Sequence, residues 1–425
     1  MDDHPVRVAV TDDLRRSRLT VFFRLLLAIP HFIWLILWSI AAFLAAIAAW
    51  FAALFTARVP DALHRFLSAY VRYATHLGAY LTLAANPYPG FTGEPGYPVD
   101  VELPEPQPQP RWKIALRLFL ALPALLLAGV VGWSASGGNG AQQSQQRGDD
   151  MYWTGGFVGV AATCALLAWF VSLVRGRTAN GLRDLSAYGI GYGAQAYAYG
   201  LLLTDRYPNA DPAALGPAWS LAPHPVRLIL TDDGRRSRLT VLFRLLLALP
   251  HVVWLLLWTI AAFLAAIVNG LVALVRGRSA EPLHRFLAAY VRYAAHVTAF
   301  VTLVANPFPG FTGAPGYPVD IAIGEAERQN RWITLFRTFL VIPAFFVSGA
   351  LFGALTLVGF FGWFASLATG RMPTGLRNLG AVAIRYHAQT NAYWFVVTDH
   401  YPYASPALQP PPQPVAEAEP VEAAA

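Results

Sequence analysis

The stretch LTVFFRLLLAIPHFIWLILWSIAAFLAAIAAWFAALFTA, from Leu19 to Ala57, decides the fold because it carries only one charged residue, Arg24. As one straight helix it would be about 58 Å long, which is nearly twice the hydrocarbon thickness of a bilayer. A nearly identical copy follows at a shift of 220 positions, where Arg24 returns as Arg244 and Pro30 as Pro250. This repetition has to be interpreted before any single motif.

A weaker repeat lies within each copy. A shift of 93 positions takes Arg24 to Arg117 and Arg244 to Arg337. The chain therefore divides into four tandem units, each with a short alternating strand, a basic stretch, the long apolar run and a third, mixed aromatic and basic helix. We place the units at 1–96, 97–216, 217–316 and 317–404, with a polar loop insertion at 134–154 and a disordered tail at 405–425.

The composition is typical of a membrane protein. Hydrophobic residues make up 56% of the chain and charged residues 13%, whereas about a quarter of a soluble domain is charged. The net charge is +7, but the basic residues adjoin apolar runs, which favours anionic membrane lipids over nucleic acid as partners. The single cysteine, Cys164, excludes an intrachain disulfide and a multi-cysteine metal site. We expect no cofactor.

Comparison of the units indicates how the apolar run crosses the membrane. Pro30 and Arg58 are 28 residues apart, but Pro123 and Arg177 are 54 apart, because unit two holds the polar insertion. An insertion is tolerated where a chain already turns at a surface. We therefore predict that each run is a hairpin of two membrane helices, with its tip near residues 39–43 in unit one.

Basic residues flank the open end of every predicted hairpin, and the positive-inside rule places all four open ends in the cytoplasm. The prediction is an all-α polytopic protein of the cell membrane, with about eight transmembrane helices and both termini in the cytoplasm. The third helix of each unit, Asp61 to Ala85 in unit one, is expected to lie on the membrane surface as an amphipathic interfacial helix. If the third helices also span, the chain makes twelve crossings.

The strands that open the units carry opposite charges at equivalent positions. Arg7 lies in the strand of unit one, and Asp100 occupies the same position in unit two. Pairing of adjoining units would bring these charges together across the ladder. We therefore predict a small cytoplasmic sheet in which Arg7 meets Asp100.

Four arginines recur inside the apolar runs, each six residues before a proline. They are Arg24, Arg117, Arg244 and Arg337. The simpler interpretation is that each side chain snorkels to nearby headgroups from the end of a membrane helix. The functional interpretation is an inward-facing cluster that binds an anionic lipid headgroup or another anion.

A second set of candidates lies on the third helices, where Arg72 and His76 recur as Arg292 and His296. Interfacial anchoring is the simpler interpretation, and headgroup binding is the functional one. Units two and four carry glutamine at the histidine position, namely Gln195 and Gln389. Metal ligands would not alternate with glutamine in a symmetric site, so no metal is predicted.

The recurring motifs also resemble a known family. They are Phe23-Arg24-Leu25 to Pro30, Gly277-Arg278, and Leu203-Thr204-Asp205-Arg206-Tyr207-Pro208. This pattern is similar to that of an uncharacterised bacterial membrane family, domain of unknown function 4389, over nearly the whole chain. Units one and three depart from it with Asn-Pro endings. The resemblance implies an integral membrane protein and brings no activity.

For function, the sequence favours a structural or anionic-lipid-binding membrane protein. A transporter of a lipid or small molecule is the first alternative, because internal repeats are common in transporters. A membrane-embedded enzyme is the second alternative. The sequence has no Ser-His-Asp order, phosphate-binding glycine loop or nucleotide fingerprint, and the pair Asp12-Asp13 is interpreted as a helix cap.

Overall fold

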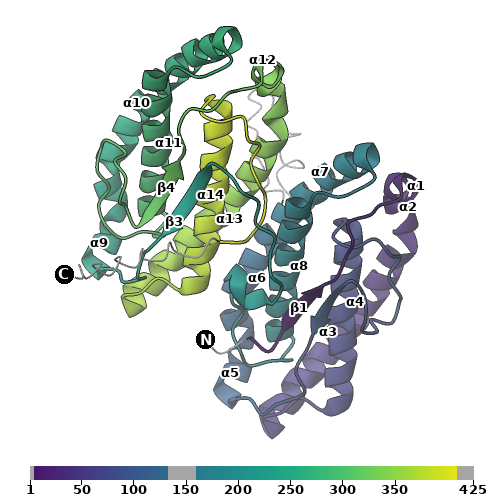
Figure 1. Ribbon diagram of the computed structural model, residues 1–425. Helices are drawn as coiled ribbons and strands as arrows, with labels where there is room; N and C mark the ends of the chain where they lie inside the picture. Colours follow the sequence, from purple (N-terminus) through teal and green to yellow (C-terminus); the bar gives the residue numbers. More distant parts are fainter. Residues whose placement is uncertain (1–3, 133–158, 409–425) are drawn as a thin grey trace, which may run out of the picture.

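The computed structural model describes residues 4–132 and 159–408. Figure 1 shows two halves side by side, with units one and two in purple to teal and units three and four in green to yellow. The halves meet where α13 (Ile342–Thr369) contacts α6 (Arg117–Val131) and α7 (Val160–Arg175). The predicted loop insertion and most of the predicted tail lie outside the described residues.

Each unit has the same order of elements: a short strand, a kinked apolar helix and a third helix that packs back along it. Unit one contains β1 (Arg7–Val10), α1 (Arg18–Phe22), α2 (Arg24–Leu27), α3 (Ile29–Thr56) and α4 (Asp61–Leu81). Unit two contains β2 (Val99–Glu102), α5 (Arg111–Ala115), α6, α7 and α8 (Asn180–Gly200), followed by the short 3-10 helix η2 (Pro212–Leu215). Unit three contains β3 (Val226–Leu230), α9 (Arg238–Leu242), α10 (Arg244–Arg276) and α11 (Glu281–Val301). Unit four contains β4 (Val319–Ile323), α12 (Arg331–Leu340), α13 and α14 (Thr374–Trp394).

The predicted hairpins are wrong, because α3, α10 and α13 each run as one continuous helix through the predicted tip. The tip in unit one, residues 39–43, contains neither glycine nor proline, so nothing in it stops a helix. The Ser39 hydroxyl there is 2.9 Å from the hydroxyl of Tyr70 on α4, so one face of this stretch packs against α4 while Ile40 and Phe43 on the other face are exposed. Three helices, α3, α10 and α13, are long and apolar enough to cross a membrane, so the described residues do not confirm eight.

Unit two explains why its insertion suggested a turn in the other units. There the long helix is divided into α6 and α7, and both parts pack against α8. A Cβ on Gly189 of α8 would lie 2.4 Å from the carbonyl oxygen of Val131 and 3.3 Å from the Cβ of Ala161. The end of α6 and the start of α7 thus meet the same residue. The insertion interrupts one helix and does not mark a turn shared by all units.

The third helices form the core of the fold, because one face of each packs inside the protein. Their predicted position at the membrane surface stays a prediction. α4 contacts α8, and α11 contacts α14. Their largest fully buried side chains include the tyrosines Tyr73, Tyr188, Tyr192, Tyr293 and Tyr393. The polar residues that made these helices appear amphipathic are directed at strands and helix ends inside the protein, as described below.

Each half contains a two-stranded antiparallel sheet built from adjoining units, as the sequence predicted. The predicted charge pair is wrong in register, because Arg7 lies opposite Glu102, and Asp100 lies opposite Ala9. Antiparallel strands run in opposite directions, so equivalent positions face each other only at the centre of the ladder. β2 lies against α4 and β1 against α8, so each strand packs on the third helix of the other unit in its half.

Paired units also exchange their basic segments. α1 contacts α7, and α5 contacts α3. The Arg16 backbone N–H donates to the carbonyl of Gly176 at 2.9 Å, and the Gln109 N–H donates to the carbonyl of Ala57 at 2.7 Å. The second half repeats these contacts between Arg236 and Gly370 and between Gln329 and Gly277, both at 2.9 Å. Reciprocal contacts between two units therefore hold each half together.

Exposed apolar side chains are concentrated on the long helices, by which we mean α3, α6 with α7, α10 and α13. Phe55, Phe119 and Val275 are 74%, 77% and 76% exposed. The most apolar windows of α3 and α10 are each only 11% buried, whereas that of α13, at the junction of the halves, is 50% buried. Soluble monomers rarely expose apolar patches of this extent, so this surface requires lipid or a partner.

Candidate functional site

The four recurring arginines are buried and cap the C-terminal ends of the third helices. Arg24 is 2% exposed, and its guanidinium lies 4.2 Å from the ring centre of Tyr80. It donates to the carbonyl of Tyr80, to that of Ala85 at 3.0 Å, and to the side-chain oxygen of Asn86 at 3.3 Å. A cation at this position complements the carbonyl end of the α4 dipole.

The other three arginines repeat this geometry with a partner that differs between odd and even units. Arg244 donates to Ala305 and to the side chain of Asn306, whereas Arg117 and Arg337 donate to the side chains of Gln109 and Gln329. Each lies over an aromatic ring, at Tyr199, Phe300 and Tyr393 respectively for Arg117, Arg244 and Arg337. Each third helix is therefore capped by a buried arginine from its own unit.

This placement matches neither the snorkelling side chain nor the inward-facing anion-binding cluster of the sequence analysis. The four guanidinium groups lie at four separate helix ends, and each is at most 3% exposed. An anion could reach them only by displacing the carbonyl oxygens that they already bind, and each displaced carbonyl would lose a charge-assisted hydrogen bond. Headgroup binding by these residues remains an untested prediction that the geometry disfavours.

The second candidate set fixes the strands to the third helices. His76 Nε2 lies 2.8 Å from the Asp100 carboxylate of β2, and Arg72 Nε lies 3.5 Å from the same oxygen. The backbone N–H of Gly96 donates to the other carboxylate oxygen at 2.7 Å. Half two repeats this arrangement, with His296 at 2.8 Å and Arg292 at 3.6 Å from Asp320. These residues contact a carboxylate that is half-buried at Asp100 and buried at Asp320. Headgroup binding by them stays an untested prediction.

The hydrogen bonds to Asp100 outweigh the cost of burying it. Burial raises the pKa of this carboxyl, but the bonds from His76 and from the N–H groups of Gly96 and Val101 favour the charged form. The net result is a pKa below the ordinary value, and Asp320 behaves in the same way. Both groups are therefore ionised at neutral pH and hold their strands as anions.

The alternation of histidine with glutamine follows from the exchange of strands. The Gln195 side chain donates to the carbonyl of Val6 at 2.9 Å and accepts from the N–H of Asn209 at 3.0 Å. Gln389 makes the same contacts with Val226 and Tyr403. Odd helices thus present histidine to an acidic even strand, and even helices present glutamine to the backbone of an odd strand. The alternation reflects two docking modes between units.

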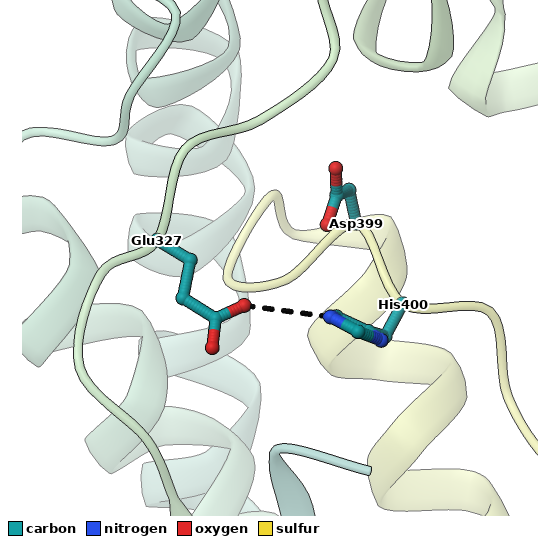
Figure 2. A group of neighbouring side chains, drawn as sticks. All are labelled: Glu327, Asp399 and His400. Carbon is teal, nitrogen blue, oxygen red and sulfur yellow. Dashed lines mark ion pairs between the residues drawn. The ribbon is translucent and has the colours of Figure 1, made fainter. Parts of the chain in front are cut away.

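One group of side chains has the residue types of a metal site. Figure 2 shows Glu327, Asp399 and His400, whose potential ligand atoms lie within 4.8 Å of one another. His400 Nε2 is 3.5 Å from the Glu327 carboxylate, and an Asp399 oxygen accepts from the Asn330 N–H at 3.2 Å. The three side chains thus already have partners within the protein, and Glu327 and His400 are exposed. We assign no metal to this group.

Exposed arginines gather where the C-terminal end of a long helix meets the basic segment of the paired unit, and we call each such place a corner. The α3 corner holds Arg58 and Arg111, and the α7 corner holds Arg15, Arg18, Arg175 and Arg177. The α10 corner holds Arg276, Arg278, Arg328 and Arg331, and the α13 corner holds Arg235, Arg238 and Arg371. At each corner one arginine caps the long helix; Arg331, for example, donates to the carbonyl of Val275 at 2.9 Å.

The basic residues of the corners entered the sequence-based prediction only through the positive-inside rule. Gly277-Arg278 ends the long run of unit three, but its partner Arg328 lies 50 positions further along the chain, in unit four. These two residues face each other in an isolated antiparallel bridge, as do Arg15 and Arg177. Only the exchange of segments between units brings such pairs together.

Comparison with known proteins places the chain in a family. No curated protein and no solved structure shows significant similarity to it. Four stretches match the family described as Domain of unknown function (DUF4389), at residues 18–92, 156–210, 238–312 and 331–405. These stretches cover more than half of the chain. Each runs from the basic segment to beyond the end of the third helix, except in unit two, where the match begins after the insertion. The chain therefore belongs to this family of unknown function, in four tandem copies.

Proposed function

We propose that this protein is a structural, lipid-binding membrane protein whose long helices lie within one leaflet, parallel to the membrane surface. The observation that carries the proposal is the position of the corners relative to the apolar surface. α1, at the start of the long helix of unit one, contacts the end of α7, while α3, at the end of that helix, contacts α5. Figure 1 shows these two contacts at opposite ends of the first half.

The distribution of arginines supports this orientation over a spanning one. α3 alone has 28 residues, about 42 Å at 1.5 Å per residue, so the α3 and α7 corners are separated by roughly the depth of a bilayer. If α3 crossed the membrane, these corners would lie on opposite sides, contrary to the positive-inside rule. In a long helix parallel to the surface, both corners lie at the same headgroup level.

The layers of the fold are consistent with the same orientation. The apolar side chains are exposed on the long helices, and the strands lie against the third helices. A layer one helix deep is about 10–12 Å thick and fits within the hydrocarbon of one leaflet. A spanning arrangement would instead place Arg72 of α4 and its partner Asp100 at the depth of the hydrocarbon beside α3, where charged groups are costly.

Cysteine labelling from one side of the membrane tests the proposal. Arg58→Cys and Arg177→Cys place a thiol at the two ends of the first half, and both native side chains are exposed. The wild-type chain is the control, because its single cysteine, Cys164, is fully buried. In sealed vesicles, a membrane-impermeant maleimide should label both variants from the same side. Labelling from opposite sides would show that the long helices cross the bilayer, and it would contradict both this proposal and the cytoplasmic placement of all four open ends that the sequence predicted.

Membrane attachment itself is checked by extraction. Burial of the long helices in lipid predicts that alkaline carbonate leaves the protein in the membrane pellet. Recovery of the protein in the supernatant would show that the apolar surface contacts another protein instead.

A further inference from the structure

The α10 corner forms a groove with an unbalanced positive charge. The groove has a volume of about 730 Å³ and is lined by Arg276, Gly277, Arg278, Ala326, Arg328, Gln329 and Arg331. All four arginines are exposed, and they come from the C-terminal end of α10 with the residues just after it, and from the start of α12 with the residues just before it. A groove of this size accommodates a phosphate group together with part of a glycerol backbone.

The charges in this groove are not neutralised within the protein. Arg278 and Arg328 face each other in the antiparallel bridge, an arrangement of like charges that destabilises a ladder. Among the residues that the structure describes, no carboxylate forms an ion pair with Arg276, Arg278 or Arg328. The carbonyl end of α10 contributes only about half a negative charge, and Arg331 already binds it.

Two carboxylates that adjoin the groove in sequence are directed elsewhere. Glu327, next to Arg328, points to His400, as Figure 2 shows. Glu281, which follows α10, lies 3.3 Å from Arg285 of its own helix. The groove therefore has a net charge of more than +3, and no carboxylate among the described residues lines it.

The backbone that carries these arginines is held in place by a buried network. The Gln329 N–H donates to the carbonyl of Gly277 at 2.9 Å, and its side chain donates to the carbonyl of Val396 at 2.8 Å and to Ser279 at 2.9 Å. Arg337 donates to the Gln329 side-chain oxygen at 3.0 Å. The buried cap of α14 thus fixes the loop that presents Arg328. A site built on a fixed loop loses little entropy when it binds a ligand.

Apolar side chains continue directly from the groove. Val275, Leu271 and Trp332 are 76%, 61% and 71% exposed. Tryptophan is enriched at the depth of the lipid headgroups, and one guanidinium group can donate two parallel hydrogen bonds to a phosphate. Resting on the proposed membrane location, we propose that the α10 corner is a binding site for the phosphate of an anionic phospholipid, with its acyl chains along Leu271 and Val275.

The α3 corner provides a matched contrast within the same chain. There Thr56 stands in place of Arg276, and Pro108 in place of Arg328. Arg58 is 2.8 Å from Asp61, and Arg111 donates to the carbonyl of Phe55 at 2.8 Å. The same fold is therefore present with two arginines in place of four, one of them paired with a carboxylate, so we expect no headgroup site there.

Titration of the purified protein in neutral detergent tests the site. The probe is dioctanoyl phosphatidic acid, with dioctanoyl phosphatidylcholine and inorganic phosphate as separate arms, and native mass spectrometry counts the lipids bound. R278Q/R328Q should remove one bound phosphatidic acid and weaken its apparent affinity by tenfold or more, because both side chains are exposed and not used in the fold. The matched double variant R58Q/R111Q should leave the count unchanged and alter affinity less than twofold.

Three results would overturn the assignment. One is an unchanged lipid count in R278Q/R328Q with an unchanged melting temperature. Another is an equal loss of bound phosphatidic acid in the two double variants, which would indicate general charge attraction. The third is inorganic phosphate binding as tightly as the lipid, which would identify a soluble anion as the ligand. The titration is done in detergent, so its outcome is independent of the labelling result that tests membrane orientation.

Discussion

Arginine caps two kinds of helix end in this protein, one inside the fold and one at its surface. Arg337 is 3% exposed and binds the end of α14, where it donates to the carbonyl of Thr398 at 2.9 Å. Arg331, six residues earlier, is exposed and binds the end of α10 in the paired unit. Arg337 therefore caps a helix of its own unit, whereas Arg331 caps a helix of the paired unit.

This difference separates structural arginines from those available to a ligand. The terminal guanidinium nitrogens of the four buried arginines donate to carbonyl and amide oxygens. Only the Nε of each of these arginines has no hydrogen-bond partner. At the corners, one arginine caps the long helix and the others are exposed, with Arg58 and Arg235 paired to the exposed carboxylates of Asp61 and Asp233. Recurrence in all four units marks both sets equally, so recurrence alone does not identify a binding site.

The largest effect is expected from removing a buried cap. Arg337→Met should lower the free energy of unfolding by about 3 kcal/mol, because it leaves buried carbonyls of α14 and the Gln329 side chain without a donor. Denaturant titration in detergent, followed by circular dichroism, measures the loss. Arg331→Met is the surface control and should cost about 0.5–1 kcal/mol. Equal losses in the two variants would remove the distinction between the sets.

A somewhat smaller effect is expected from the clamped carboxylates. Asp320→Asn should lower the free energy of unfolding by about 2 kcal/mol, because a neutral amide binds His296 and Arg292 more weakly than an anion does. The folded-state pKa of Asp320 lies below its ordinary value. The stability that it contributes is therefore present above pH about 4 and is lost as pH falls through the folded pKa.

Acid titration of unfolding separates this contribution from others. The wild-type protein should lose stability more steeply below pH about 4 than Asp320→Asn does. Asp233→Asn is the matched control, because the Asp233 side chain is 64% exposed and its backbone contact suits an amide oxygen as well. If the control changed the acid slope as much as Asp320→Asn, the clamp would not be the source of the effect.

The smallest effect is expected from transferring the α10 corner to the α3 corner. T56R/P108R gives the α3 corner the arginines that the α10 corner has at these positions. We expect one additional phosphatidic acid per chain and about tenfold tighter binding at that corner, which corresponds to about 1.4 kcal/mol. Native mass spectrometry counts the added lipid. No gain would show that the unpaired charge at the α10 corner is insufficient for a site.

Some features of the fold could be predicted from the sequence because they depend on local pattern or on repetition. The constant shift between copies identified the four units, and Asp61 was correctly placed at the start of the third helix. Pairing of strands from adjoining units also followed from their position in the repeat. The hairpins were predicted wrongly, because the insertion in unit two was taken as evidence for a turn in all four units.

The candidate site was harder to predict, because burial cannot be read from spacing. Arg24 and Arg278 both border apolar runs, yet one is 2% exposed and the other is exposed to solvent. The strand exchange that pairs His76 with Asp100 also leaves no local signal, since the two residues belong to different units. Only the alternation of histidine with glutamine hinted at two docking modes.

By itself, the sequence determined the number of units, the order of their elements and the apolar character of the long helices, because these follow from composition and repetition along the chain. Tertiary structure decided which arginines are buried, which unit each strand packs against and where unpaired positive charge accumulates. These outcomes depend on contacts between residues of different units, such as Arg278 with Arg328, and no local pattern specifies such contacts.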